Sequence, residues 1–158
     1  MIRARRVPAS VLVLTAAVAL AGCTTTVSME PAPGANDPAC AEISVLLPGT
    51  LDGQDRRWTD AQATGAWGDP SAVLFTCGLE PPGPTTLPCQ TVNGVDWIID
   101  ESAAPNYRVT SFGREPAVEI YLDNDVVGSA EVLDRLSLIV SRLPETGATC
   151  LDRADAED

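Results

Sequence analysis

Residues 107–122 read YRVTSFGREPAVEIYL, which predicts two strands joined by a tight turn. Polar and apolar residues alternate on both sides of the turn at 113–116, so Val118, Ile120 and Leu122 share one face. A helix is predicted next, at about 130–143, because apolar residues recur there every three or four positions. A half-buried hairpin followed by an amphipathic helix is typical of an α+β domain.

The flanking sequence adds further elements to this domain. Asp37 and Pro38 form a helix start, and a short helix is predicted over about 38–47. A buried strand is predicted at 72–77 and a second hairpin at 90–99, around Asn93-Gly94. Residues 49–70 are polar, and we expect an irregular loop there. The predicted fold is therefore α+β: an antiparallel sheet of about four strands with two helices packed on one face, stapled by disulfides.

The N-terminal residues have the pattern of a bacterial lipoprotein signal. Three arginines precede an uncharged run from Val7 to Gly22, which is shorter than the roughly 20 residues of a membrane-spanning helix. The run ends in Leu-Ala-Gly-Cys at 20–23, the lipobox pattern. We predict cleavage before Cys23 and a diacylglycerol on its thiol, which anchors the chain to the extracytoplasmic side of the cell membrane. The alternative is a simple secretory signal that is cut elsewhere.

Four segments follow from this prediction. Residues 1–22 are the expected signal peptide, and 23–36, rich in Thr, Pro and Gly, are an expected lipidated tether without a core. Residues 37–151 form the single α+β domain, and 152–158 form an acidic tail.

The four remaining cysteines predict two disulfides, because an even number in an exported domain favours pairing. Four cysteines can pair in three ways, and all three stay open. We favour the pairing with the following two bonds. Cys77–Cys89 closes a short loop rich in Pro and Gly, and Cys40–Cys150 ties the ends of the domain together.

Charge and composition exclude several function classes. Seven arginines and 22 acidic residues follow Gly22, a net charge of −15, so nucleic acid is not an expected partner. The chain has no histidine and no lysine, which removes the usual bases for nucleophilic catalysis. No cofactor or metal is expected: Asp123 to Asp134 partly resembles a calcium loop, but Val127 stands where an oxygen ligand belongs. A pair of carboxylates acting as a hydrolase remains an alternative.

A few large cationic and aromatic side chains are candidates for ligand binding. Arginine suits carboxylate or phosphate groups, and indole rings stack on sugars or peptides. If they converge beside the sheet, they form a cleft for a small anion or a glycan. The interpretation that we favour places the tryptophans in the core and pairs the arginines with nearby acids, since bulky aromatic side chains usually pack inside a protein. The candidates are Arg56, Arg57, Trp67, Trp97 and Arg114.

Several motifs resemble those of one uncharacterised family, a domain of unknown function found in exported lipoproteins of high-GC Gram-positive bacteria. The motifs cover nearly the whole mature domain in the same order. They are DPAC at 37–40, LDGQDRR at 51–57, AWGDP at 66–70 with Cys77-Gly78, VNGVDW at 92–97 and FGREPAVE at 112–119. The resemblance implies lipid anchoring and no known activity.

Together these observations favour a membrane-anchored extracytoplasmic lipoprotein that is not an enzyme. We expect it to act as a binding or accessory module of the cell envelope, with the membrane as partner through Cys23 and an envelope protein or glycan as a possible ligand.

Overall fold

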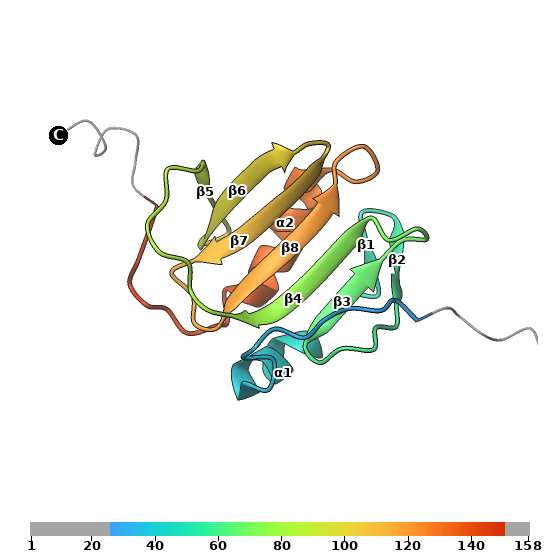
Figure 1. Cartoon of the computed structure of the whole chain (residues 1–158), viewed down its shortest axis with the longest axis horizontal. Helices are drawn as coiled ribbons and strands as arrows, with labels where there is room; N and C mark the ends of the chain where they lie inside the picture. The colour runs from blue at the N-terminus through green and yellow to red at the C-terminus, as the bar shows by residue number, and fades with distance from the viewer. Residues whose placement is uncertain (1–25, 151–158) are drawn as a thin grey trace, which may run out of the picture.

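The computed structural model describes residues 26–150, which form one twisted sheet with two helices (Figure 1). The predicted signal peptide, Cys23 and the acidic tail lie outside the described residues. In the described chain, no helix is long and apolar enough to cross a membrane. The elements are α1 (Pro38–Ser44), β1 (Thr50–Leu51), β2 (Gln54–Arg57), β3 (Thr64–Trp67), β4 (Val73–Leu79), β5 (Cys89–Val92), β6 (Val95–Ala103), β7 (Asn106–Phe112), β8 (Ala117–Asp123) and α2 (Ser129–Val140).

The protein is α+β, but its sheet has eight antiparallel strands rather than about four. The strand order is β1-β2-β3-β4-β8-β7-β6-β5. Five of the strands, β4 to β8, lie in segments that the sequence predicts as strands. The other three, β1 to β3, lie in residues 50–67, where the prediction of an irregular loop is wrong. Asp52 and Gly53 adopt positive φ angles of 44° and 75° and turn the chain between β1 and β2. These strands are short and lack a clear alternation, so periodicity did not reveal them.

Both predicted hairpins are present and form one half of the sheet. Asn93 and Gly94, with φ angles of 48° and 75°, connect β5 to β6 with Val92 opposite Val95. Residues 113–116 connect β7 to β8. The two halves of the sheet are joined by the pairing of β4 with β8, which are far apart in the sequence. In the sheet, β8 therefore lies between β4 and β7.

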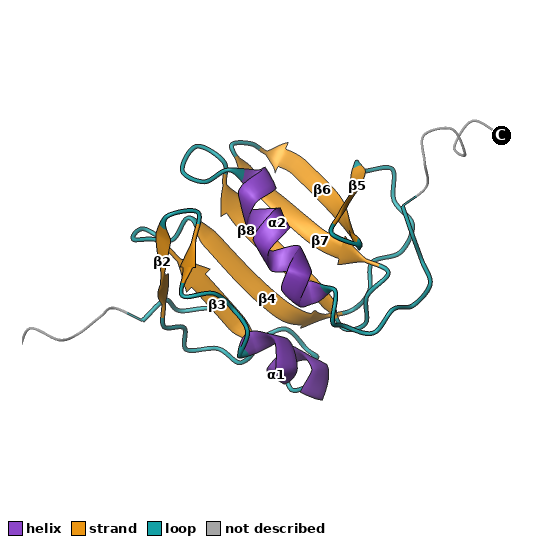
Figure 2. Ribbon diagram, turned by 180° about the vertical axis from the view of Figure 1, so that it is seen from behind, coloured by secondary structure: helices purple, strands orange, loops and turns teal. Residues whose placement is uncertain are grey.

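The core lies between the sheet and α2. Figure 2 shows α2 crossing one face of the sheet, whereas α1 lies beside the ends of β3 and β4. Alternation along β4 and β8 places Phe75 and Ile120 on the α2 side, and both are fully buried. The apolar stripe of α2 supplies Val132, Leu136 and Val140, which are also fully buried. This packing explains why the 130–143 region is amphipathic.

The disulfides are Cys40–Cys77 and Cys89–Cys150, so the favoured pairing of Cys77 with Cys89 and Cys40 with Cys150 is wrong. Cys77 lies on β4 and Cys89 on β5, and four inter-strand steps separate these strands in the sheet. At roughly 4.8 Å a step this is about 19 Å, far beyond the roughly 7 Å that a disulfide can bridge between Cα atoms. Cys77 instead points toward α1, where Cys40 is fully buried.

Residues 27–36, predicted to be part of a flexible tether, lie against the domain instead. The Val27 amide donates to the carbonyl of Trp58 (2.8 Å), and Val27 forms a parallel bridge with Thr59. The Gly34 amide donates to the carbonyl of Gly78 (2.8 Å), and Ala35 is buried. The ordered domain therefore begins near Val27 rather than at Asp37, because backbone hydrogen bonds fix a segment that has few side chains to bury.

Candidate functional site

The cleft of arginines and tryptophans that the sequence offered as an alternative is not formed. Trp67 on β3 and Trp97 on β6 are fully buried and lie on different halves of the sheet, so neither can stack on a ligand. Each indole N–H has a protein acceptor: Trp67 Nε1 donates to the carbonyl of Pro48 (3.0 Å), and Trp97 Nε1 to Ser137 Oγ (2.9 Å). Both tryptophans are core residues, as the favoured interpretation of the sequence predicted.

The three candidate arginines bind groups of the protein itself and do not converge on one site. Arg56 lies over the Trp67 ring at 6.0 Å and donates to the carbonyl of Leu47 (3.0 Å), and desolvation by partial burial lowers its pKa. Arg57 pairs with Asp69 at 2.9 Å. These two residues lie on β2, next to the edge strand β1.

Arg114 is a structural residue of the opposite half. Its side chain is 6% exposed, and it donates to the carbonyls of Gly94 (2.7 Å), Ser141 (3.1 Å) and Leu143 (2.9 Å). It also pairs with the exposed Glu145 at 3.0 Å. The guanidinium therefore joins the β5–β6 turn to the chain that leaves α2, and its donors are used within the protein.

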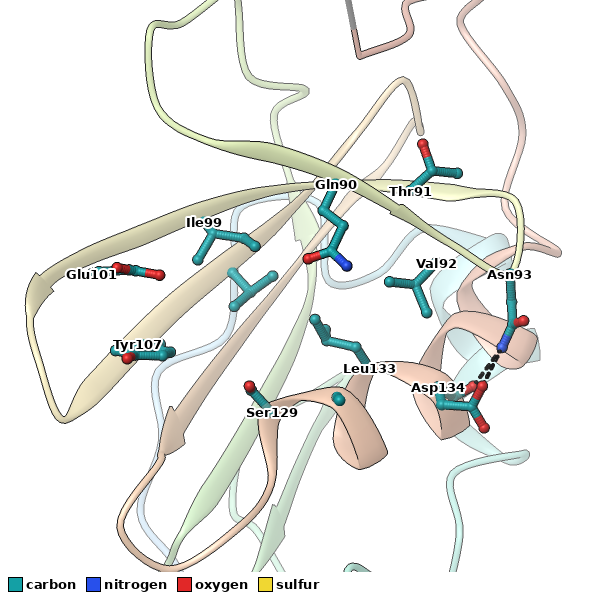
Figure 3. Close-up of a pocket in the computed structure, with 12 residues that line it drawn as sticks. Gln90, Thr91, Val92, Asn93, Ile99, Glu101, Tyr107, Ser129, Leu133 and Asp134 are labelled. Atoms are coloured by element: carbon teal, nitrogen blue, oxygen red, sulfur yellow. Dashed lines mark hydrogen bonds between the residues drawn. The ribbon is translucent and has the colours of Figure 1, made fainter. Parts of the chain in front are cut away.

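A groove of about 500 Å³ lies between α2 and the β5–β7 half of the sheet (Figure 3). We call it the β5–α2 groove. Its apolar surface comes from Val92, Ile99, Val109 and Leu133, and Tyr107 closes one side. Its polar rim carries Gln90, Thr91, Asn93, Glu101, Ser129 and Asp134.

Strand alternation and one side-chain clamp shape this groove. The register pairs Gln90 with Trp97, and Val92 with Val95, so these side chains of β5 share the α2 side of the sheet. Asn93 Nδ2 donates to both the carbonyl (3.0 Å) and Oδ1 (2.9 Å) of Asp134, as the dashed lines of Figure 3 show. This clamp ties the hairpin turn to the middle of α2 and leaves the groove open beside it.

The groove has acidic groups and no basic ones along its lining. An anionic ligand would therefore meet Glu101 and Asp134 without a compensating cation, whereas a neutral or cationic group with an apolar body would fit. Its residues escaped prediction because alternation identifies which side chains face α2. It does not reveal where the helix and the sheet separate.

Among the described residues, two carboxyl groups have clearly shifted pKa values, and both shifts are downward. Hydrogen bonds from the Met29 amide and the Ser28 hydroxyl lower the pKa of Asp60, and those from the Ser102 hydroxyl and amide lower the pKa of Asp100. A general acid for glycoside hydrolysis needs a raised pKa, so neither residue suits that role. Within residues 26–150 no cluster of three or more His, Cys, Asp or Glu side chains could hold a metal ion.

The two disulfides indicate an extracytoplasmic protein, because such bonds persist in oxidising compartments. A search of curated proteins found no significant match, and neither did a search of solved structures. The sequence does match the family described as "Protein of unknown function (DUF3515)" over residues 6–148. Because this match spans most of the chain, the protein belongs to the DUF3515 family of proteins of unknown function.

Proposed function

We propose that this protein is an exported lipoprotein, anchored through Cys23, whose domain binds an envelope component in the β5–α2 groove without catalysing a reaction. The observation that carries the anchoring is the lipobox at 20–23 followed by a domain whose four cysteines form two disulfides. An acyl anchor with more than one chain suits such an acidic domain, which anionic lipid headgroups would otherwise repel.

The position of the groove supports a role directed away from the membrane. The chain enters the domain beside β2 and β3, where Val27 is bonded to Trp58, and the groove lies on β5, β6 and β7 (Figure 1). Five inter-strand steps separate β2 from β6 in the sheet, a distance of roughly 24 Å. An anchored domain would therefore present the groove at the end far from its attachment.

The lining of the groove selects the ligand class. Four aliphatic side chains offer a surface for an apolar group, and Glu101 and Asp134 favour a positive or neutral neighbour. A peptide segment with an apolar side chain beside a basic or uncharged residue meets both conditions. This proposal replaces the alternative of an anion- or glycan-binding cleft, whose aromatic residues are buried.

Anchoring is tested by Cys23→Ser expressed from the full chain. We expect the wild type to partition into the detergent phase of Triton X-114 and to carry a diacylglycerol on its N-terminal residue by mass spectrometry. The variant should lose both properties, and Thr25→Ser, a hydroxyl exchange outside the lipobox, should retain them. An unmodified N-terminus on the wild type, or unchanged partitioning of Cys23→Ser, would refute the proposed anchor.

Binding is tested by a thermal-shift screen of short envelope peptides and glycans. A ligand specific for the groove should raise the melting temperature with its concentration. Ala130→Arg places a long side chain in the groove from an exposed helical position and should abolish the shift. Glu131→Arg adds the same side chain one residue along α2, where it does not line the groove, and should preserve the shift. Equal responses of the two variants would exclude this groove as the site.

A further inference from the structure

Trp58 differs from the other two tryptophans in its exposure. Its relative exposure is 78%, whereas Trp67 and Trp97 have none. The residue follows directly after β2. The described chain leaves most of its surface in solvent, unlike that of Trp67 and Trp97. An indole has an apolar body and a polar N–H, so it suits an interface that is apolar on one side and wet on the other.

Trp58 lies beside the first residues of the described chain. Its carbonyl accepts the Val27 amide at 2.8 Å, and the Asp60 amide donates to the carbonyl of Val27 at 3.3 Å. The Met29 amide donates to Asp60 Oδ1 at 2.8 Å. These hydrogen bonds hold residues 27–29 along residues 58–60. The start of the described chain therefore lies next to Trp58.

The length of chain before this region limits its distance from the membrane. Cys23 is four residues before Val27, and four residues span at most about 14 Å when fully extended. A thiol acylated at Cys23 lies at the lipid surface, so the Trp58 region must lie within that distance of the same surface. This step rests on the proposed anchoring.

We propose that the indole of Trp58 inserts into the headgroup region of the bilayer that holds the acyl chains of Cys23. Indole rings favour this region, since their apolar surface leaves water while the ring N–H keeps a polar partner. Attachment through Cys23 supplies the proximity that a single side chain could not provide by itself. The β1–β2 end of the sheet then faces the membrane, and the β5–α2 groove points away from it.

The test uses the full chain purified with its lipid from membranes and reconstituted into vesicles of phosphatidylcholine and phosphatidylglycerol. Bromine atoms on the upper acyl chains quench an indole on contact. Because Trp67 and Trp97 are buried, quenching reports Trp58. We expect brominated vesicles to reduce the tryptophan emission of the wild type and to leave that of Trp58→Phe unchanged. The unacylated chain starting at Thr24, mixed with the same vesicles, should show no loss.

Two results would overturn the proposal, and they are distinguishable. Equal emission in brominated and plain vesicles, with aqueous iodide quenching the acylated chain as fully as the unacylated one, would place Trp58 in water while leaving the anchor intact. A wild-type chain without lipid by mass spectrometry would overturn both the anchoring and the insertion of Trp58.

Discussion

At the scale of single residues, buried polar groups hold segments together that are far apart in the sequence. Arg114 shows this most clearly, since its guanidinium joins three backbone carbonyls from two separate loops. Trp97 does the same across the core through Ser137. In both cases a polar atom that the fold removes from water has a protein partner, which is the condition for burying it at little cost.

Arg114→Ala should reduce the free energy of unfolding by about 3 kcal/mol, because three carbonyls lose their donor in a buried setting. Arg114→Lys should recover part of this loss, since an ammonium group keeps the charge but lacks the planar fork. Urea unfolding followed by fluorescence measures both. Glu145→Ala is the control: its carboxylate is 72% exposed, and we expect a loss below about 1 kcal/mol. A loss as large as that of Arg114→Ala would assign the effect to the ion pair instead.

Asp60 should contribute to a decrease in the free energy of unfolding at acid pH. Its pKa is lowered in the folded protein, chiefly by the Met29 amide, so the ionised form favours folding. This contribution is fully present above the unfolded aspartate pKa of about 4 and is lost as the pH falls through the lower folded value. Urea unfolding at a series of pH values should show a smaller acid-induced decrease for Asp60→Asn than for the wild type. Parallel curves would show that Asp60 contributes nothing to the pH dependence.

At the scale of elements, close backbone approach attaches the N-terminal segment to the sheet. Gly78 on β4 has a φ of 108°, and its carbonyl accepts the Gly34 amide. A Cβ atom at Gly78 would lie 2.4 Å from the carbonyl carbon of Gly34. Only glycine permits both the dihedral angle and this contact, so the segment 27–36 depends on this residue for its position.

Gly78→Ala should therefore destabilise the domain by more than about 2 kcal/mol and release the N-terminal segment. Hydrogen exchange should show faster exchange of the Gly34 and Val27 amides, and thermal unfolding gives the loss of stability. Gly83→Ala is a matched control, since no atom lies within 4 Å of its Cβ position and its φ is not positive. We expect that control to retain wild-type stability and exchange. Unchanged exchange in Gly78→Ala would contradict the attachment through β4.

At the scale of the whole molecule, two disulfides fasten opposite ends of the fold. Cys40–Cys77 joins α1 to β4 within the core, and Cys89–Cys150 joins the edge strand β5 to the C-terminal segment. The closed loops span 37 and 61 residues. In the chain-entropy model each bond contributes about 4 kcal/mol, a large share of the stability of a small domain.

The two bonds should differ in their resistance to reduction. Cys40 and Cys77 are fully buried, whereas Cys89 is exposed. A thiolate must reach a sulfur atom to cleave the bond, so Cys89–Cys150 should be reduced first in the folded protein. Timed reduction with dithiothreitol, alkylation and peptide mass spectrometry would establish the order. Simultaneous reduction would show that opening of the whole domain precedes both cleavages.

The hairpins at 90–99 and 107–122 and the apolar stripe of α2 followed from the sequence alone. Alternation and turn residues act between neighbours, and the turn at Asn93-Gly94 needs only the left-handed tolerance of two adjacent residues. The lipobox is also local, and the prediction of acylation at Cys23 depends on it without reference to the fold. The α+β class followed because these local patterns bury one face each.

The tertiary structure alone decided the disulfide partners, the place of residues 27–36 and the existence of the β5–α2 groove. Each depends on the pairing of β4 with β8 and on how α2 lies across the resulting sheet. That pairing joins strands about forty residues apart, and its free energy comes from a whole buried face rather than from any short motif. Local periodicity determines which side of a strand is apolar, whereas the neighbours on that side are set by the packing of the complete chain.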